Sequence, residues 1–118
     1  MAISHKGRAK LDRNGRLYLW WVADVADSHW CGHVLNVYSD DKAFRIGYPL
    51  RQAADLSKEP FLWVWGREFV GLPDAGGRWI QIRCPRRDDA EITPGFVRAL
   101  IDWCMSEKPI VRVEWPER

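Results

Sequence analysis

Cysteine, lysine and long apolar runs are all scarce in this sequence of 118 residues. Its three cysteines are too few and too widely spaced for a disulfide framework, which favours a reducing compartment. The longest apolar run, residues 17–23, is far too short to cross a bilayer. No apolar segment follows the basic first ten residues, so the pattern predicts no signal peptide. We therefore expect a soluble, cytoplasmic protein with no membrane partner.

Recognisable catalytic signatures are also missing. The sequence contains no Gly-x-Ser-x-Gly elbow, no P-loop, no dinucleotide-binding glycine fingerprint and no His-Glu-x-x-His motif. Carboxylate pairs occur at residues 40–41 and 88–89, in expected turns and connections, where Asp is favoured for its backbone hydrogen bonds. These absences favour a protein that binds over one that catalyses.

The charge balance is nearly even, with 18 basic and 16 acidic residues and a formal net charge of +2. A net charge this small does not by itself indicate nucleic-acid binding. Arginine nevertheless outnumbers lysine by 13 to 5. Its planar guanidinium stacks on rings and binds phosphate or carboxylate, although GC-rich coding would produce the same bias. Composition therefore leaves the partner open.

Tryptophan, in contrast, is abundant, with eight in the chain. An indole offers a broad apolar surface and one N–H donor, so it suits a core or a recognition surface. Trp63 and Trp65 lie two residues apart and would share one face of a strand with Phe61 and Phe69. We expect this aromatic row to be the core face packed on the main helix, and a recognition surface is the alternative. Either way, the strand presents more apolar area than one helix covers.

Turn and periodicity signals predict mostly strands. The pair Asn14-Gly15 is typical of a type I′ turn, which would join strands at residues 8–12 and 16–25. The second of these strands is apolar on both faces, as expected of a strand covered on both sides or exposed and adhesive on one. Further strands are predicted at residues 33–39, 43–48, 61–70, 78–84 and 110–115.

The one strong helix signal covers residues 93–107. Thr93 is a typical N-cap, and Pro94 suits the first helical position. Apolar residues then recur at spacings of three and four and form one face: Phe96, Val97, Leu100, Ile101 and Cys104.

These elements predict a single α+β domain over residues 1–118, with residues 1–7 as a flexible tail. We expect an antiparallel sheet of about five to seven strands, mostly hairpins, with the helix packed on it and followed by a final strand. The alternative architecture is a small, partly closed β-barrel with the same helix.

His29, Cys31 and His33 form the sharpest local motif, because these potential zinc ligands would leave one face of an extended segment. A second ligand pair is missing, so we expect neither a metal nor another cofactor. Asp24, near both histidines, could instead form an acid–base pair, which makes a small enzyme the third functional hypothesis. A concave, carboxylate-lined pocket around the histidines would favour it.

The leading hypothesis is a small non-enzymatic binding protein that uses an aromatic sheet surface. That surface would form a homodimer, hold a planar or cationic ligand, or do both. Five strand residues are the candidates for this interface or ligand site: Tyr18, Trp20, Trp63, Trp65 and Trp115.

A nucleic-acid-associated protein is the second hypothesis, since bases stack on rings while cations bind phosphates. The densest basic patch with an aromatic neighbour supplies its candidates: Trp79, Arg83, Arg86 and Arg87. Acidic residues next to this patch make the second hypothesis weaker than the first.

Overall fold

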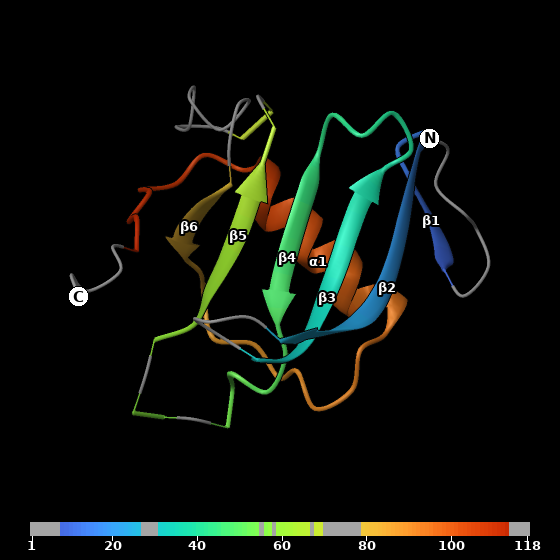
Figure 1. Cartoon of the computed structure of the whole chain (residues 1–118). Helices are drawn as coiled ribbons and strands as arrows, with labels where there is room; N and C mark the ends of the chain where they lie inside the picture. The colour runs from blue at the N-terminus through green and yellow to red at the C-terminus, as the bar shows by residue number, and fades with distance from the viewer. Residues whose placement is uncertain are drawn as a thin grey trace.

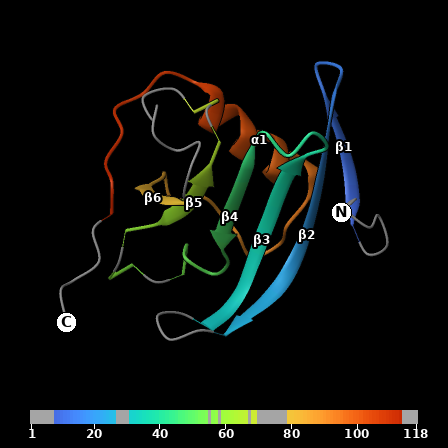
Figure 2. The same ribbon diagram turned by 45° about the horizontal axis from the view of Figure 1, so that its top comes forward.

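The computed structural model describes residues 8–26, 31–54, 56–57, 59–66, 68–69 and 79–113. They form six strands and one helix: β1 (Ala9–Arg13), β2 (Arg16–Ala26), β3 (Cys31–Ser39), β4 (Arg45–Pro49), β5 (Phe61–Trp65), β6 (Ile80–Arg83) and α1 (Pro94–Met105). The strands pair antiparallel in chain order, and β1 and β6 are the two edges of an open sheet. Helix α1 crosses one face of this sheet (Figures 1 and 2). The predicted α+β architecture is confirmed, in its open-sheet form.

The turn of the first hairpin, between β1 and β2, is determined by its local sequence. Asn14 and Gly15 both have positive φ, 55° and 82°, as a type I′ turn requires. The backbone N–H of Gly15 also donates to the carboxylate of Asp12 (3.1 Å). This predicted turn is confirmed, and it sets the register in which β2 pairs with β1.

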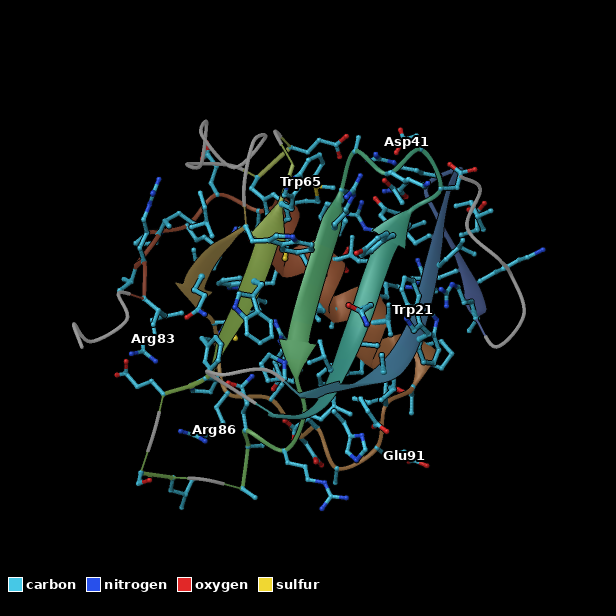
Figure 3. The ribbon with its side chains drawn as sticks, viewed as in Figure 1. Trp21, Asp41, Trp65, Arg83, Arg86 and Glu91 are labelled. Carbon is cyan, nitrogen blue, oxygen red and sulfur yellow. The ribbon has the colours of Figure 1, made fainter. Side chains whose placement is uncertain are left out.

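Ser39 and Asp41 shape the turn between β3 and β4, which Figure 3 labels at Asp41. The Ser39 hydroxyl donates to Asp41 Oδ1 (2.6 Å), and that oxygen also accepts from the backbone N–H of Ala43 (3.1 Å). Arg16 of β2 adds its Nη2, 3.0 Å from the same oxygen. These contacts, the Ser39 hydroxyl foremost, lower the pKa of Asp41 to about 2. The turn predicted at residues 40–41 is confirmed.

Helix α1 begins as its sequence predicts. Thr93 is the N-cap, and its hydroxyl accepts from the backbone N–H of Phe96 (3.1 Å). The helix ends at Met105, two residues earlier than predicted, because the Ser106 backbone turns out of helical conformation and its N–H donates to Trp103. The ammonium of Lys108 satisfies two of the last carbonyl groups, those of residues 104 and 106.

Strand register divides the sheet into two faces, because directly opposed residues lie on the same side. The face that contacts α1 is mainly aliphatic, and its buried strand residues are Leu11, Tyr18, Leu35, Val37, Ile46, Tyr48, Leu62, Val64, Ile80 and Ile82. Helix α1 covers them with four side chains that are fully buried: Val97, Leu100, Ile101 and Cys104. Of the predicted helix face, only Phe96 is half-buried.

The expectation that the aromatic row faces the helix is wrong. Leu62 and Val64 are fully buried against α1, whereas Trp63 and Trp65 lie half-buried on the opposite side. Val64 lies opposite Ile46, so the helix packs over compact side chains, and the wide indoles remain on the uncovered face. The fourth member, Phe69, is buried but stacks on the ring of Phe44 at 5.0 Å, beyond the end of β5. Because both sides of this strand are apolar, its sequence pattern does not determine which side faces the helix.

Two strands differ most in length from the expectation. Strand β5 ends at Trp65 because Gly66 turns with φ of +128°, where an added Cβ would lie 2.2 Å from the Ala43 carbonyl oxygen. The final strand is reduced to one bridge between Ile82 and Arg112. The predicted tail at residues 1–7 lies outside the described residues. Among the helices within them, none is long and apolar enough to cross a membrane.

Leu100 is fully buried between α1 and the sheet. Its replacement in Leu100→Ala leaves a cavity in a packed core, so we expect the free energy of unfolding to fall by about 2–5 kcal/mol. Urea denaturation followed by tryptophan fluorescence measures this change. Glu107→Ala, at an exposed position just beyond the helix, is the control and should change stability by less than about 0.5 kcal/mol. An equally small loss for Leu100→Ala would show that this helix face is not in the core.

Candidate functional site

The side of the sheet away from α1, here called the open face, carries rings and arginines beside two buried aliphatic residues, Leu19 and Val34, and the described residues supply no helix to cover it. It is viewed directly in Figures 1 and 3, with α1 behind the sheet. Register places these residues on it: Trp21, Asn36, Tyr38, Arg45, Gly47, Phe61, Trp63, Trp65 and Arg83. All the rings among them are half-buried, so each presents part of its surface to solvent.

Arginines stack on the rings at both ends of this surface. The guanidinium of Arg8 lies 3.8 Å from the ring centroid of Trp21, and Arg45 lies 4.1 Å from that of Trp65. Arg45 is also 5.4 Å from the ring of Tyr38, which contacts Trp21 edge-on at 5.1 Å. Such pairs are cation–π contacts, and a stacked guanidinium still offers N–H donors at its edge. The protein's own cations therefore occupy the ring faces where a cationic ligand would bind.

The centre of the open face combines two residues that strands disfavour. Asn36 and Gly47 are directly opposed on the central strands β3 and β4. A Cβ added to Gly47 would lie 3.3 Å from Trp63 Cε3 and 3.9 Å from Asn36 Oδ1, so glycine lets the indole lie close to the sheet. Within the described part of the chain, the Asn36 side chain has no hydrogen-bond partner. The centre thus places the half-buried ring of Trp63 near an amide that has no hydrogen-bond partner among the described residues.

The open face is positively charged. Its basic side chains, with Arg8 over Trp21 included, are Arg8, Lys10, Arg45 and Arg83. Asp12 is the acidic residue on the same side of β1, and Glu59 pairs with Arg83 at 3.5 Å while remaining largely exposed. Among the described residues, basic groups therefore outnumber acidic groups on this surface, although the whole chain is nearly neutral.

The structure separates the residues proposed for the interface. Trp63 and Trp65 lie on the open face. Tyr18 is 1% exposed and lies in the core, and Trp20 packs against that core from the α1 side. Both were expected on an exposed surface, and neither lies on one. On β2 it is Trp21, not Trp20, whose side chain lies on the open face. Trp115 lies outside the described residues.

The proposed nucleic-acid cluster is also divided. Arg83 lies on the open face and binds the Glu59 backbone carbonyl (2.9 Å). Arg86 instead donates to the carbonyl of Gln52 (2.8 Å), which holds the connection after β6 to the segment after β4. Trp79 is half exposed ahead of β6. Arg87 is half-buried, and its Nε has no hydrogen-bond partner. The sequence therefore indicated an arginine–ring combination but not Arg8, Arg45, Trp21 or Tyr38, which lie far apart along the chain.

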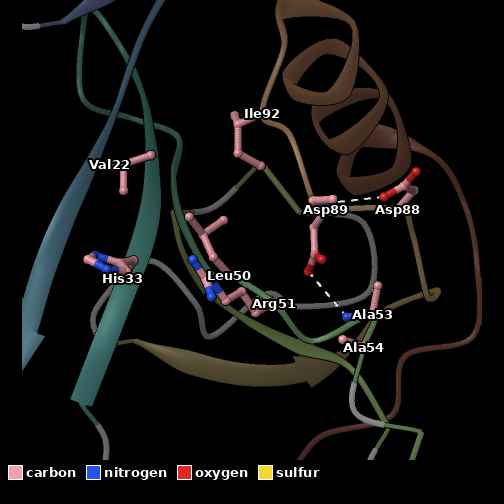
Figure 4. Close-up of a pocket in the computed structure, with 10 residues that line it drawn as sticks. Val22, His33, Leu50, Arg51, Ala53, Ala54, Asp88, Asp89 and Ile92 are labelled. Atoms are coloured by element: carbon pink, nitrogen blue, oxygen red, sulfur yellow. Dashed lines mark hydrogen bonds between the residues drawn. The ribbon is translucent and has the colours of Figure 1, made fainter.

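A cavity of about 680 Å³ lies on the other side of the sheet, toward α1. Figure 4 shows its walls, formed by Val22, His33, Leu50, Arg51, Ala53, Ala54, Asp88, Asp89, Ala90 and Ile92. Nδ1 of His33 pairs with the carboxylate of Asp24, and both side chains are largely exposed, at 54% and 85%. A carboxylate-lined pocket around both histidines would favour the enzyme hypothesis, and of the two histidines this cavity is shown to include His33 alone. His29, the other member of that hypothesis, lies outside the described residues.

Asp89 is the deepest polar group of the cavity, at 5% exposure. Its Oδ2 accepts hydrogen bonds from the Tyr48 hydroxyl (3.0 Å) and from the backbone N–H groups of Gln52 (2.8 Å) and Ala53 (3.3 Å). Burial, and then the Asp89 charge, raise the pKa of the Tyr48 phenol above its ordinary range. The phenol is therefore held as a hydrogen-bond donor to Asp89.

Metal-ligating groups do not gather in the described part of the chain, where no three His, Cys, Asp or Glu side chains could hold an ion. Of the motif at residues 29–33, the His33 side chain is described, and His29 and the Cys31 side chain are not. Burial raises the pKa of the Cys84 and Cys104 thiols to about 12. Both thiols are therefore protonated at neutral pH, the form that neither attacks nor ligates.

Tyr48→Phe removes the hydroxyl that donates to Asp89, and we expect it to destabilise the protein by about 1–2 kcal/mol at neutral pH. The folded protein keeps this phenol protonated at a pH where the unfolded chain, with a pKa near 10, already ionises. The advantage of the wild type is therefore complete below pH 10 and shrinks as the pH rises above it. Urea unfolding of both proteins from neutral pH to about pH 11 tests this. A stability difference that stays constant over that range would contradict it.

No family model, curated protein or solved structure matches this chain. Its function is therefore inferred from the two surfaces described above, the open face of the sheet and the cavity beside α1.

Proposed function

We propose that this protein binds single-stranded nucleic acid on the open face of its sheet. One observation carries the proposal: Trp21 and Trp63 flank the unused amide of Asn36, and Arg8 and Arg45 stack on rings of the same surface. Unpaired bases stack on exposed aromatic rings, and arginines beside those rings bind the phosphates. The open face of this sheet therefore offers rings for base stacking and arginines for phosphate binding on one surface.

The charge of the open face favours an anionic partner over the alternatives. A cationic ligand would meet rings whose faces Arg8 and Arg45 already occupy. A two-fold homodimer through this face would place its arginines against the same arginines of a second copy, and like charges in an interface are costly. A polyanion with planar groups avoids both problems, because its phosphates pair with the arginines and its bases stack on guanidinium planes as well as on aromatic rings.

The shape of the open face favours a single strand over a duplex. In a duplex the base faces are stacked on each other, and only base edges are accessible in the grooves. Trp21 on β2 and Trp63 on β5 are three strands apart, about 14 Å at the usual strand spacing, which leaves room for more than one splayed base. Asn36, between them, can donate to and accept from a base edge, as Asn does with adenine.

Fluorescence anisotropy tests whether the rings bind nucleic acid. The probes are a labelled oligonucleotide of mixed sequence and its duplex. We expect the single strand to bind more tightly than the duplex. Trp21→Ala and Trp63→Ala should each weaken single-strand binding by roughly fivefold or more, because each stacked base contributes about 1–3 kcal/mol. Trp103→Ala, on the α1 side of the molecule, is the matched control and should bind as the wild type does. Circular dichroism verifies that all three variants are folded.

Self-association is the competing outcome, and sedimentation equilibrium at micromolar concentration detects it. A dimer that Trp21→Ala dissociates, in a protein with no oligonucleotide affinity, would overturn the proposal in favour of a homodimer. A monomer that binds the oligonucleotide supports the proposal.

The salt dependence of oligonucleotide affinity distinguishes the role of the arginines from that of the Asn36 amide. Arg45→Gln removes a phosphate contact, so the plot of log affinity against log salt concentration should become shallower by about one. Asn36→Ala removes a base contact, so it should weaken binding to adenine-rich strands while the salt slope stays the same. An unchanged slope for Arg45→Gln would show that the stacked guanidinium does not contact phosphate.

A further inference from the structure

The cavity on the α1 side has the dimensions and walls of a small-molecule site, and the open face does not use it. Its volume of about 680 Å³ lies within the range of roughly 300–1,000 Å³ that ligand pockets occupy. Val22, Leu50 and Ile92 give it an apolar wall, and Val22 is 45% exposed there. These residues come from β2, from the position just after β4 and from the connection before α1. The cavity therefore depends on tertiary packing.

Asp89 is the polar group in this cavity that lacks a charge partner. Its carboxylate is buried, yet its Oδ2 is held only by neutral donors, the Tyr48 hydroxyl and two backbone N–H groups. Among the described residues, no basic side chain forms a salt bridge with Asp89, and its Oδ1 has no donor. A buried carboxylate without a cation is costly. A cationic ligand at Oδ1 would compensate that cost.

The other charges of the cavity also favour a cationic ligand. Asp88, next to Asp89, is exposed at the rim and uses one oxygen to accept from the Ala90 backbone N–H (3.2 Å). Besides His33, which pairs with Asp24, the described lining residues carry two carboxylates and one guanidinium, that of the exposed Arg51. The lining is therefore net negative, and solvent screens Arg51 more than it screens the buried Asp89.

We propose that this cavity binds a small organic cation, a primary ammonium group on an apolar body. The ammonium would donate to Asp89 Oδ1 and to the free oxygen of Asp88, and the apolar body would contact Val22, Leu50 and Ile92. A primary ammonium is favoured over a quaternary one because it has three N–H donors, whereas quaternary ammonium groups are recognised by aromatic cages. Among the described residues of the lining, His33 is the one ring.

Three probes of similar shape test the charge requirement on the full chain: 2-phenylethylamine, 2-phenylethanol and 3-phenylpropionate. In two-dimensional ¹H–¹⁵N NMR titrations, we expect the amine to bind at millimolar concentration or below. Its shifts should centre on residues 50–54 and 88–92, and the alcohol and the acid should bind at least fivefold more weakly. An acid that binds as tightly as the amine would assign the site to Arg51 and His33 and would overturn the proposal. No binding of the amine would overturn it as well.

Two substitutions test which carboxylates bind the ammonium group. Asp89→Asn keeps an oxygen for the Tyr48 hydroxyl but removes the charge, so we expect the amine to bind roughly tenfold more weakly. Asp88→Asn, at an exposed position, should weaken it about threefold and remains informative if Asp89→Asn is poorly folded by near-ultraviolet circular dichroism. Asp40→Asn, in the exposed β3–β4 turn, is the matched control and should bind the amine as the wild type does. Unchanged amine affinity in both cavity variants would refute the assignment of these carboxylates.

Discussion

The packing of α1 on the aliphatic side of the sheet determines where the other side chains can lie. Leu100 and Ile101 of the helix are fully buried against strand residues such as Ile46 and Val64. Side chains alternate along a strand, so once one set faces the helix, the other set must face away from it. One helix covers one side of a six-stranded sheet, and within the described residues no second helix is available for the other side.

The open face is stabilised by its own residues in the absence of such a cover. Arg8 and Arg45 lie over indole rings and shield part of their apolar surface while keeping donors at the surface. Asn36 and Gly47, in contrast, are unfavourable in strands, and within the described residues no hydrogen bond of the Asn36 amide compensates for this. Residues that violate local preference in this way are typical of functional sites, and here they lie at the centre of the surface proposed to bind nucleic acid.

The buried carboxylate of Asp89 links stability to the second surface. It receives donors from Tyr48 on β4 and from the segment that follows β4, so it holds the connection before α1 against the sheet. The same hydrogen bonds keep one oxygen of Asp89 in place beside the cavity. A group that helps to define the fold is thereby pre-organised to meet a ligand, at no further cost in conformational entropy.

Local signals determined much of this fold in advance. The Asn14-Gly15 pair required a turn with two positive φ angles, and Thr93 followed by Pro94 required a helix start, because both depend on backbone conformations within a few residues. The spacing of apolar residues likewise determined which side of α1 is buried. The antiparallel order followed from short connections between neighbouring strands.

The tertiary structure alone decided which side of each apolar strand faces the helix. Strands β2 and β5 are apolar on both sides, so alternation could show that Trp20 and Trp21 point in opposite directions but not which of them is covered. The cavity could not be read from the sequence either, since it joins His33 to Asp89, which are far apart along the chain. In both cases the outcome depends on long-range packing of α1 and its connection against the sheet, which no local pattern encodes.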